Sequence, residues 1–311
     1  MGKSLARPPP TGNGEYPGIP NPSKTMHLRT TLFTLALLTS CRTVTGPTWR
    51  AIDTERNTEV SIEEMAEALE GYDVVFLGEL HDNDVGHDLQ LQLTRALGER
   101  RGSIALSLEM FERDAQDQVD LYLEGVIDEE RFLANSRPWP NYTEHYRPAV
   151  ELARERGWSV IAANCYRPIA SRVAREGLGS AAGNPWAARR VDAGPGPYRD
   201  LFEAAMGDHA QQMGSRMDRF FAAQCIKDDT MAESIARFIE HRGEAAPMVV
   251  HWNGRFHSDF GLGTVERLVS RQPELSMAVV TTITTDDRSR SLTGIERQQA
   301  RFVWLVPEQG D

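Results

Sequence analysis

Two stretches far apart in the chain present a histidine in the same setting. Residues 74–82 read VVFLGELHD, and residues 248–259 read MVVHWNGRFHSD. Each is an apolar run followed by Gly-x-x-His, with His81 in the first and His257 in the second, and an aspartate comes within two residues. The composition alone gives roughly 0.6 such strings by chance, so two unrelated turn residues are the alternative. The setting favours a shared site, because an apolar run before each motif and helical periodicity after it indicate a buried strand entering a turn.

The ends of neighbouring apolar runs carry further groups that could do chemistry. Glu79 stands two residues before His81, Glu109 ends the next apolar run, and Asn164 ends the one after that. In a parallel sheet the carboxyl ends of the strands lie on one edge, so His81, Glu109, Asn164 and His257 are predicted to share one pocket. Two imidazoles with one or two carboxylates suit zinc, manganese or iron and leave positions open for water or substrate.

The predicted metal ligands are His81, Glu109 and His257. Glu79 is the predicted general base, because it lies two residues from a ligand and needs no metal of its own. Three further side chains would support or orient the ligands: Asp82, Asn164 and Asp259. For Glu109 the alternative is a carboxylate at a helix N-terminus, where the helix dipole favours it.

The other histidines lack this setting. His87 follows His81 by six residues and reads as a solvated or capping residue, and His251 falls inside the apolar run, as a hydrogen-bonded core histidine would. The chain has no Gly-x-Ser-x-Gly motif, so serine hydrolysis is disfavoured. It also lacks a His-Glu-x-x-His helix, a phosphate-binding loop and a Gly-x-Gly-x-x-Gly motif.

The elements that must position these side chains alternate between strands and helices. Predicted strands cover residues 74–77, 104–108, 159–163, 248–250, 277–283 and 302–306, the last at an edge. This alternation predicts an α/β fold with a mainly parallel sheet flanked by helices. A helical insertion at about 198–241 separates the third strand from the fourth. That insertion and the proline- and aromatic-rich loop 137–146 are expected to cover the pocket and supply an apolar wall.

Residues 1–41 are predicted to lie outside the fold. Residues 1–25 are rich in proline and glycine and offer no apolar face to bury. Met26 then begins a short basic stretch, an apolar core and small residues that end at Cys41, a pattern typical of a secretory signal too short to span a bilayer. The ending resembles a bacterial lipobox, which predicts lipidation at Cys41 and a lipoprotein of the bacterial cell envelope, anchored to the outer membrane. An ordinary signal peptide with a coincidental cysteine is the alternative.

Composition sets further bounds on the partners. The chain has 311 residues and a net charge of −11, which argues against a nucleic-acid partner. Anionic headgroups repel an acidic protein, so membrane attachment would rest on acyl chains at Cys41. Residues 42–60 read as a linker, and residues 61–311 as a single α/β domain. Beyond Cys41 only Cys165 and Cys225 remain, which form neither a disulfide framework nor a metal-site spacing.

Several blocks of the sequence carry a family resemblance. They are LGELHDN at 77–83 with His87 and Gln90, LEMFERDAQ at 108–116, YRP at 146–148 after Trp139, AAN at 162–164, DTMAESIA at 229–236 and NGRFH at 253–257. In this order they resemble the ChaN-like haem-binding uptake family, which shares a superfamily with the Tiki proteases and the EreA-type esterases. The similarity covers about residues 70–285, and the lipobox agrees with it, because ChaN-type proteins are typically lipoproteins.

The resemblance implies a lipid-anchored protein that binds haem or iron in iron acquisition. ChaN-type proteins can hold haem between paired subunits, so haem is the implied cofactor and a homodimer the implied assembly. Tyrosine is a suitable iron ligand, and the candidates are Tyr142, Tyr146 and Tyr166. The chain has no Cys-x-x-Cys-His motif, so any haem would be bound non-covalently.

The same resemblance leaves a second function open. Tiki proteins use paired Gly-x-x-His motifs and a glutamate in metal-dependent peptide hydrolysis, and by position these residues are His81, Glu109 and His257. A metal-dependent hydrolase acting on a peptide or an ester is therefore the alternative. The chain departs from many relatives after Asn164, where it reads CYRP instead of placing a proline soon after the asparagine.

Overall fold

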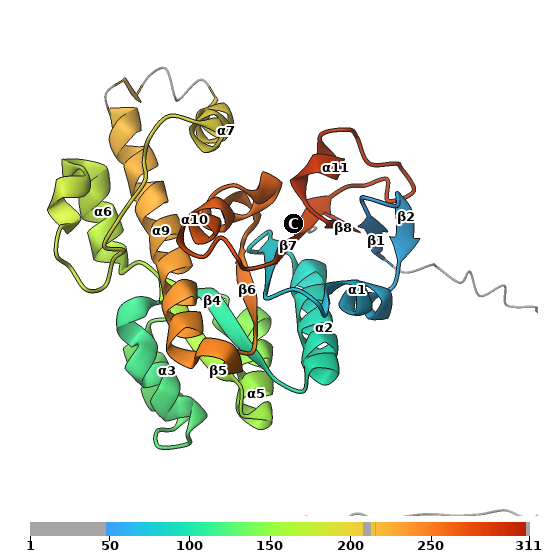
Figure 1. Cartoon of the computed structure of the whole chain (residues 1–311), viewed down its shortest axis with the longest axis horizontal. Helices are drawn as coiled ribbons and strands as arrows, with labels where there is room; N and C mark the ends of the chain where they lie inside the picture. Colours follow the sequence, from blue (N-terminus) through green and yellow to red (C-terminus); the bar gives the residue numbers. More distant parts are fainter. Residues whose placement is uncertain (1–47, 208–212, 215, 309–311) are drawn as a thin grey trace, which may run out of the picture. The chain divides into compact units, whose positions relative to one another are not determined.

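The fold is built on one eight-stranded mixed sheet (Figure 1). The computed structural model describes residues 48–207, 213–214 and 216–308, so the predicted signal segment and Cys41 lie outside the described residues. The strands lie side by side in the order β2-β1-β8-β7-β3-β6-β4-β5. Their bounds are β1 Arg50–Asp53, β2 Thr58–Val60, β3 Val74–Glu79, β4 Ile104–Glu112, β5 Ser159–Asn164, β6 Met248–Gly254, β7 Met277–Thr284 and β8 Phe302–Val306.

The sheet is parallel from β8 through to β5, and β1 pairs antiparallel with both β8 and β2. The predicted α/β class with a mainly parallel sheet is therefore confirmed. The helices are α1 Ile62–Leu69, α2 Asp84–Arg101, α3 Gln116–Leu123, α4 Glu129–Ser136, α5 Arg147–Arg156, α6 Arg167–Glu176, α7 Pro197–Met206, α9 Arg216–Arg242, α10 Thr264–Arg271 and α11 Glu296–Gln299. Shorter helical turns cover Arg113–Ala115, Tyr142–Tyr146, Leu178–Ala181, Gly243–Ala245, Arg255–His257 and Asp259–Gly261.

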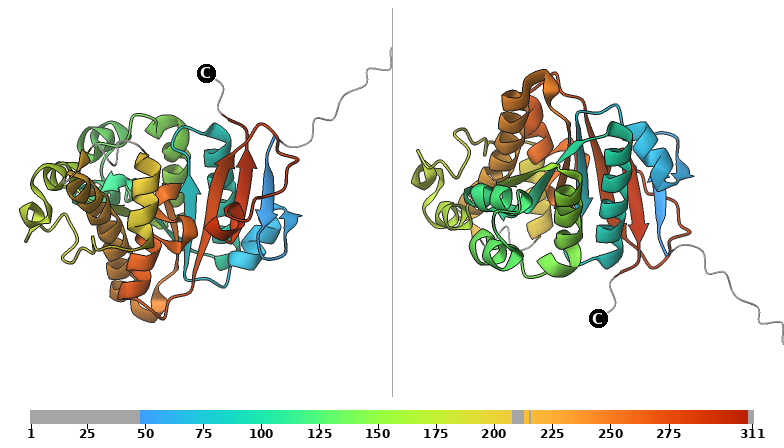
Figure 2. Two further views of the ribbon diagram at one scale, coloured as in Figure 1. Left: turned by 90° about the horizontal axis from the view of Figure 1, so that it is seen from above. Right: turned by 90° about the horizontal axis from the view of Figure 1, so that it is seen from below.

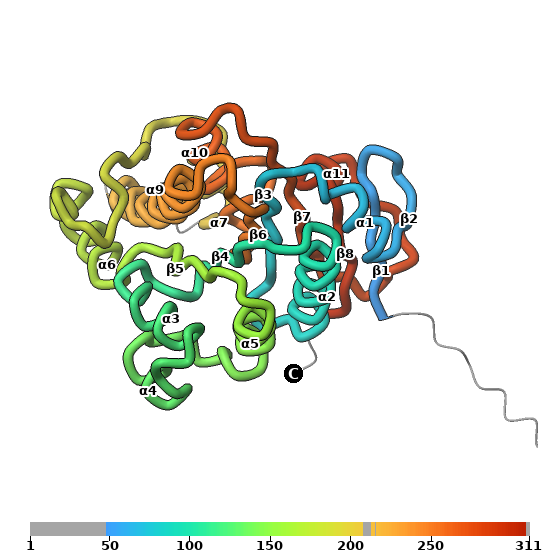
Figure 3. Tube along the Cα trace, turned by 60° about the horizontal axis from the view of Figure 1, so that its bottom comes forward, coloured from blue at the N-terminus to red at the C-terminus, as the bar shows by residue number. Residues whose placement is uncertain are grey.

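Helices pack on both faces of the sheet, as Figures 2 and 3 show. Along β3, Val75 and Leu77 join an apolar core with α1, α2, α3 and α5, whereas Val74 and Phe76 join a second core with α9 and α10. Because both faces are buried, the strand is apolar without alternation. Helices α6, α7 and α9 lie between β5 and β6 in the chain, where the insertion was expected.

Two details of the predicted organisation are wrong. Residues 42–60 were expected to form a linker, but β1 and β2 lie within this range and extend the sheet. Their short sequences, RAID and TEV, carry too few apolar residues to show a period. As a result β8, expected at an edge, is an internal strand between β1 and β7, and all of its residues are buried. In the described part of the chain, no helix is both long enough and apolar enough to cross a membrane.

Candidate functional site

A cavity of about 850 Å³ opens at the carboxyl edge of the sheet. The strands β3, β6, β4 and β5 are neighbours there, and they or the turns that follow them place His81, His257, Glu109 and Asn164 along its wall. The prediction that these side chains share one pocket is therefore confirmed. Loop 137–146 and α9 supply further walls as expected, whereas α7, the other described helix of the predicted insertion, contributes no lining residue. The other lining residues are Glu79, Leu80, Asp82, Glu112, Trp139, Pro140, Asn141, Cys165, Arg167, Gln224, Lys227, Gly254, Arg255 and Phe256.

Glu79 and His81 form the first of two carboxylate–histidine pairs. The buried Glu79 carboxylate places Oε1 2.9 Å from His81 Nδ1, and the same oxygen accepts a hydrogen bond from the Tyr146 hydroxyl. Its Oε2 accepts a hydrogen bond from Gln90 at 3.0 Å. Burial opposes the charge of Glu79, but the His81 hydrogen bond and the charge of His87 outweigh it and hold the pKa below its usual range. Glu79 is thus a charged anchor for the His81 ring.

The His81 ring packs closely against the main chain of Gly254. A Cβ atom at position 254 would lie 2.8 Å from His81 Cε1 and 2.9 Å from Nε2, so only glycine permits this approach. Trp139 meets the His81 ring edge to face, with 4.7 Å between ring centroids. The main-chain oxygen of His81 accepts a hydrogen bond from Asn141 at 2.7 Å. The His81 side chain is nevertheless 45% exposed, so a ligand in the cavity can reach it.

His257 lies between two buried carboxylates. Its Nε2 is 3.3 Å from Glu109 Oε1, and its Nδ1 is 2.7 Å from Asp228 Oδ1. The other oxygen of Glu109 accepts a hydrogen bond from the main-chain N–H of Gly254 at 2.7 Å. The other oxygen of Asp228 accepts one from the Tyr198 hydroxyl at 2.7 Å. Both ring nitrogens of His257 therefore face an acceptor, which is the arrangement of a protonated imidazole.

The charges of this site shift the pKa values of its members in opposite directions. Burial disfavours the charged form of His257, but the carboxylates of Glu109 and Asp228 outweigh burial and raise its pKa to about 10. Burial likewise opposes the charge of Glu109, yet His257 and His81 hold the pKa of that carboxyl well below its usual range. The pKa of His81 is also raised, since the hydrogen bond to Glu79 and the charge of Glu109 outweigh burial. Shifts of this kind are common at functional sites.

The arrangement does not fit a bound metal ion as it stands. Among the residues that the structure describes, no group of three or more His, Cys, Asp or Glu side chains is arranged to hold a metal. A metal ligand needs a neutral imidazole nitrogen, and both nitrogens of His257 face carboxylates instead. The ligand roles of His81, Glu109 and His257, and the role of Glu79 as a base, stay predictions.

Among the described residues, none of the three that were expected to orient the imidazoles bonds to either ring. Asp259 accepts hydrogen bonds from Arg255 at 2.8 Å and from Thr281 at 2.6 Å, because the chain turns away after His257 into the helical turn Asp259–Gly261. His257 is held by Asp228 instead, so the expectation for Asp259 is corrected. Asp82 is exposed on the cavity wall, and Asn164 accepts a hydrogen bond from the N–H of Cys165.

The tyrosines named as haem-ligand candidates differ in access. Tyr142 and Tyr146 are buried, and burial raises the pKa of both phenols far above its usual value. A buried phenol that resists ionisation is a poor iron ligand without rearrangement. Tyr166 is half-buried, and its ring contacts the Arg137 guanidinium 5.5 Å from the ring centroid. Tyr166 is the most accessible of the three, although it is not a lining residue of the cavity.

Sequence reasoning missed two residues of α9 that contact His257. They are Asp228 and Gln224, whose Nε2 lies 3.2 Å from His257 Nδ1. A signal was present, because α9 buries a run from Asp228 to Ala236 that contains Asp228, Asp229 and Glu233. Acidic side chains are almost never fully buried unless they are paired. Acidic residues within a buried stretch of helix therefore indicate specific polar partners.

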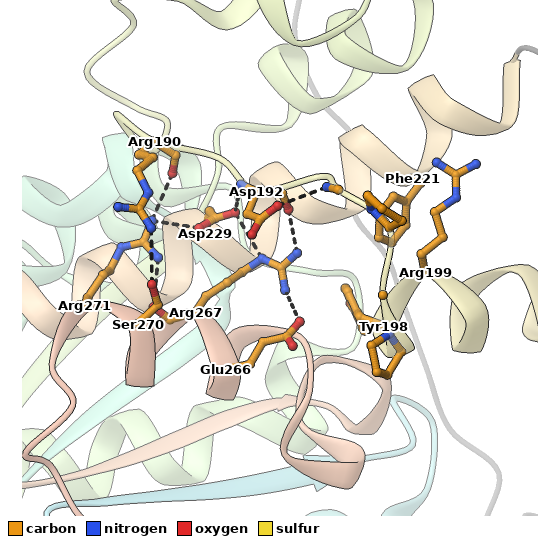
Figure 4. Close-up of a pocket in the computed structure, with 14 residues that line it drawn as sticks. Arg190, Asp192, Tyr198, Arg199, Phe221, Asp229, Glu266, Arg267, Ser270 and Arg271 are labelled. Carbon is orange, nitrogen blue, oxygen red and sulfur yellow. Dashed lines mark hydrogen bonds and ion pairs between the residues drawn. The ribbon is translucent and has the colours of Figure 1, made fainter.

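Behind Asp228, an ion-pair network joins α9 to α10. Arg267 and Arg271 both bind Asp229, at 3.0 and 2.8 Å, and Figure 4 shows the two guanidinium groups converging on it. Arg267 also lies over the ring of Tyr198, with 4.9 Å between its Cζ and the ring centroid. Since Tyr198 donates to Asp228, the network supports the residue that holds His257.

The same network binds the main chain of residues 187–192. The N–H groups of Ala188, Arg189 and Asp192 donate to the side chains of Thr230, Glu233 and Asp229 on α9. The carbonyl oxygens of residues 187, 190 and 192 accept hydrogen bonds from Arg113, Arg271 and Arg267. This segment is therefore fixed along α9 although it forms neither a helix nor a strand.

Comparisons with known proteins agree with this architecture. The family model described as "Haem-binding uptake, Tiki superfamily, ChaN" matches residues 65–268. The structure of ChaN of Campylobacter jejuni with cofacially bound haem has a TM-score of 0.60 and 16% identity, and the match covers 82% of this chain and 96% of that one. An erythromycin esterase has a TM-score of 0.42 and 14% identity, with 76% and 77% of the two chains covered.

A curated relative is the chloroplastic protein RETICULATA-RELATED 5 of Arabidopsis thaliana, 24% identical over 225 residues, which is 67% of this chain. The chain spans only 30% of the length of that relative. At these identities the likeness to the solved structures concerns the fold alone.

Proposed function

The chain belongs to the ChaN family of haem-binding uptake proteins in the Tiki superfamily, and from this premise we propose that it binds haem in the cavity at the carboxyl edge of its sheet. The observation that carries the proposal is the environment of His81. Its Nδ1 is bonded to a buried carboxylate while nearly half of the side chain is exposed to the cavity. A carboxylate behind one nitrogen orients an imidazole and raises its basicity as a ligand through the other nitrogen.

The cavity wall has the chemistry that a porphyrin needs. Leu80, Trp139, Pro140 and Phe256 supply apolar surface to the cavity that His81 lines. The volume of about 850 Å³ lies within the ~300–1,000 Å³ typical of small-molecule pockets. His81 would hold the haem iron, and the apolar side chains would contact the ring and exclude water from it. Bound haem supplies the iron chemistry and the visible absorbance by which binding is measured.

Titration with haemin tests this function. Haemin added to the protein should give a saturable shift of its Soret band, and His81→Ala should weaken the affinity at least about tenfold, since one iron ligand is lost. His241→Ala is the matched control, because His241 is an exposed histidine on α9 that does not line the cavity. No saturable shift, or equal affinity in His81→Ala and the wild-type protein, would reject His81-ligated haem binding.

We further propose that the protein is a lipoprotein of the bacterial cell envelope, attached through Cys41 and acting in iron acquisition. The lipobox-like sequence before Cys41 supports the attachment. Family membership supports haem as the iron-containing cargo. A homodimer, in which two copies enclose haem, belongs to the same proposal. Sedimentation of the protein with and without haemin tests it, with a haemin-dependent rise in mass as the expected outcome.

A hydrolase is the second candidate, and the two histidines that are each paired with a buried carboxylate favour it. Glu79 would serve as the general base beside His81, and the protonated His257, held charged by Glu109, would stabilise the negative charge that develops on the carbonyl oxygen of a peptide or ester. Cleavage of peptide and ester substrates with and without a chelator tests this candidate. Turnover that a chelator abolishes would support a metal-dependent hydrolase. Turnover that a chelator does not affect would support acid–base catalysis without a metal. No turnover would reject the hydrolase and leave haem binding as the proposed function.

A further inference from the structure

Two cationic side chains of the cavity lining make no side-chain hydrogen bond or ion pair with the residues that the structure describes. The side chains of Lys227 on α9 and Arg167 at the start of α6 both line the cavity. Neither side chain makes a hydrogen bond or an ion pair within the described part of the chain. Four carboxylates line the same cavity. Glu79 pairs with His81, Glu109 with His257 and Glu112 with Arg137, and the exposed Asp82 makes no ion pair with either cation in the described part of the chain. The two cations are therefore available to a ligand.

Lys227 is unusual for this chain. Only three of its 34 basic residues are lysines, and Lys227 is the one that lies beyond residue 24. Every other cationic side chain of the described region, apart from histidine, is an arginine. Lysine supplies a compact charge with three donors that can follow an oxygen atom, whereas arginine presents a rigid planar fork.

The position of Lys227 connects it to the site. Gln224, Lys227 and Asp228 are spaced at i, i+3 and i+4 on α9, and residues at this spacing share one face of a helix. Gln224 and Asp228 contact His257, so Lys227 belongs to the helix face that meets the cavity. Lys227 is only half-buried, which leaves its ammonium hydrated and free to bind an anion at low desolvation cost.

The apolar surface of the cavity is contributed by other elements. Leu80 follows β3, Trp139 and Pro140 belong to loop 137–146, and Phe256 follows β6. We infer that Lys227 and Arg167 form a carboxylate-binding subsite, and that the ligand is an amphiphile with an apolar body and one or more carboxylates. This inference rests on the proposed function, because haem is such a ligand, and it assigns the side chains that its propionate groups would contact.

Comparing two porphyrins distinguishes the contact between Lys227 and the carboxylates from all other contributions to binding. Haemin and its dimethyl ester share the ring and the iron, but only haemin carries carboxylates. Lys227→Met should weaken haemin binding about tenfold and leave binding of the ester unchanged within about twofold, since a hydrogen bond to a charged group is lost only with haemin. Lys227→Arg keeps the charge and should retain most of the haemin affinity. Arg95→Met, at an exposed position on α2 outside the cavity, is the matched control.

Equal weakening of both porphyrins by Lys227→Met, or no weakening of either, would overturn the subsite. A second measurement does not depend on iron ligation. Reductive ¹³C-methylation keeps the lysine charge, and the Lys227 signal is identified by its absence from Lys227→Arg. Protoporphyrin IX, the metal-free dicarboxylate, should shift that signal, whereas its dimethyl ester should not. A shift without any haemin Soret change would support the subsite and reject haem as the ligand, and no shift with either porphyrin would reject the subsite.

Discussion

At the scale of single residues, the site depends on histidines held by buried carboxylates. His257 receives one carboxylate from β4 and one from α9, and His81 receives its carboxylate from the end of its own strand. Local spacing in the sequence placed Glu79 next to His81, but as a predicted base, and Asp82 was expected to orient the ring that Glu79 holds. Local spacing could not indicate the pair Asp228 and His257, because their contact joins elements 29 residues apart. Asp259 was chosen instead for its nearness in sequence, although the turn after His257 directs it to Arg255.

The first prediction concerns the charge of His257. Asp228→Asn removes one of the two carboxylates that raise the pKa of His257 to about 10, so that pKa should fall. Asp259→Asn should leave it unchanged, since Asp259 binds Arg255 and Thr281. NMR titration of the ring nitrogens measures both variants. If Asp259→Asn lowered the pKa as much as Asp228→Asn, the assignment of Asp228 as the partner of His257 would be wrong.

The second prediction concerns the close approach at Gly254. Gly254→Ala would place a methyl group within 3 Å of the His81 ring and displace that ring into the cavity. We expect haemin affinity to fall at least about tenfold, and stability to fall by about 1–3 kcal/mol, the usual cost of an overpacked contact. Gly71→Ala is the control, because nothing lies within 4 Å of a Cβ at that position. Unchanged haemin binding in Gly254→Ala would show that the His81 position is not required.

At the scale of elements, the long apolar strands were predictable and the short ones were not. The runs that became β3 to β7 are buried on both faces, so their sequences are largely apolar and show no alternation. In β1 and β2 only Ala51 and Ile52 are buried apolar residues. The strand β1 is therefore stabilised mainly by its backbone pairing with β8, and its own sequence shows no clear strand pattern. A strand that forms through its neighbour leaves little signal in its own residues.

The third prediction tests how β1 is attached. Asp53 is buried and binds Arg301, which precedes β8, and it also accepts hydrogen bonds from the N–H groups of Glu55 and Arg56. Burial raises the pKa of Asp53, but the Arg301 hydrogen bond and the backbone hydrogen bonds outweigh burial and lower it. A lowered pKa in the folded state stabilises the protein above the unfolded value near 3.8, and this stability is lost as the pH falls further.

Asp53→Asn should therefore reduce the free energy of unfolding by about 2–3 kcal/mol near pH 7 and by much less near pH 3. Urea unfolding at the two pH values measures the difference. Glu55→Gln is the control, because Glu55 pairs with the same Arg301 but is 69% exposed, and exposed pairs contribute little. A loss for Asp53→Asn that is the same at both pH values would exclude the charge of Asp53 as its cause.

At the scale of the whole molecule, the order of strands explains why distant motifs meet. β3 lies between β6 and β7, so the two Gly-x-x-His motifs follow adjacent parallel strands although 176 residues separate His81 from His257 in the chain. Periodicity predicted each strand and the shared carboxyl edge. The strand order itself depends on which crossovers the helices allow, and no local pattern carries that information.

The fourth prediction concerns where the protein resides. Cys41→Ser should move the full chain, expressed in a bacterium with its lipoprotein machinery, from the membrane pellet to the soluble fraction, because the acyl chains would be its only attachment. Metabolic labelling with a palmitate analogue should be lost at the same time. Cys165→Ser, within the fold, should change neither result. Membrane recovery that is unaffected by Cys41→Ser would reject the anchor.

The segment 187–192 is recognised by its backbone, and this has an evolutionary consequence. The contacts from α9, α10 and Arg113 reach peptide N–H and C=O groups, which every amino acid except proline possesses in full. The identity of Ala188 can therefore drift while the path of the chain is preserved, and so can that of Arg189, whose side chain adds only an exposed ion pair with Glu233 at 3.6 Å. Selection would instead retain the side chains that accept hydrogen bonds from this backbone, namely Asp229, Thr230 and Glu233. It would exclude proline at positions 188, 189 and 192, because proline has no N–H to donate.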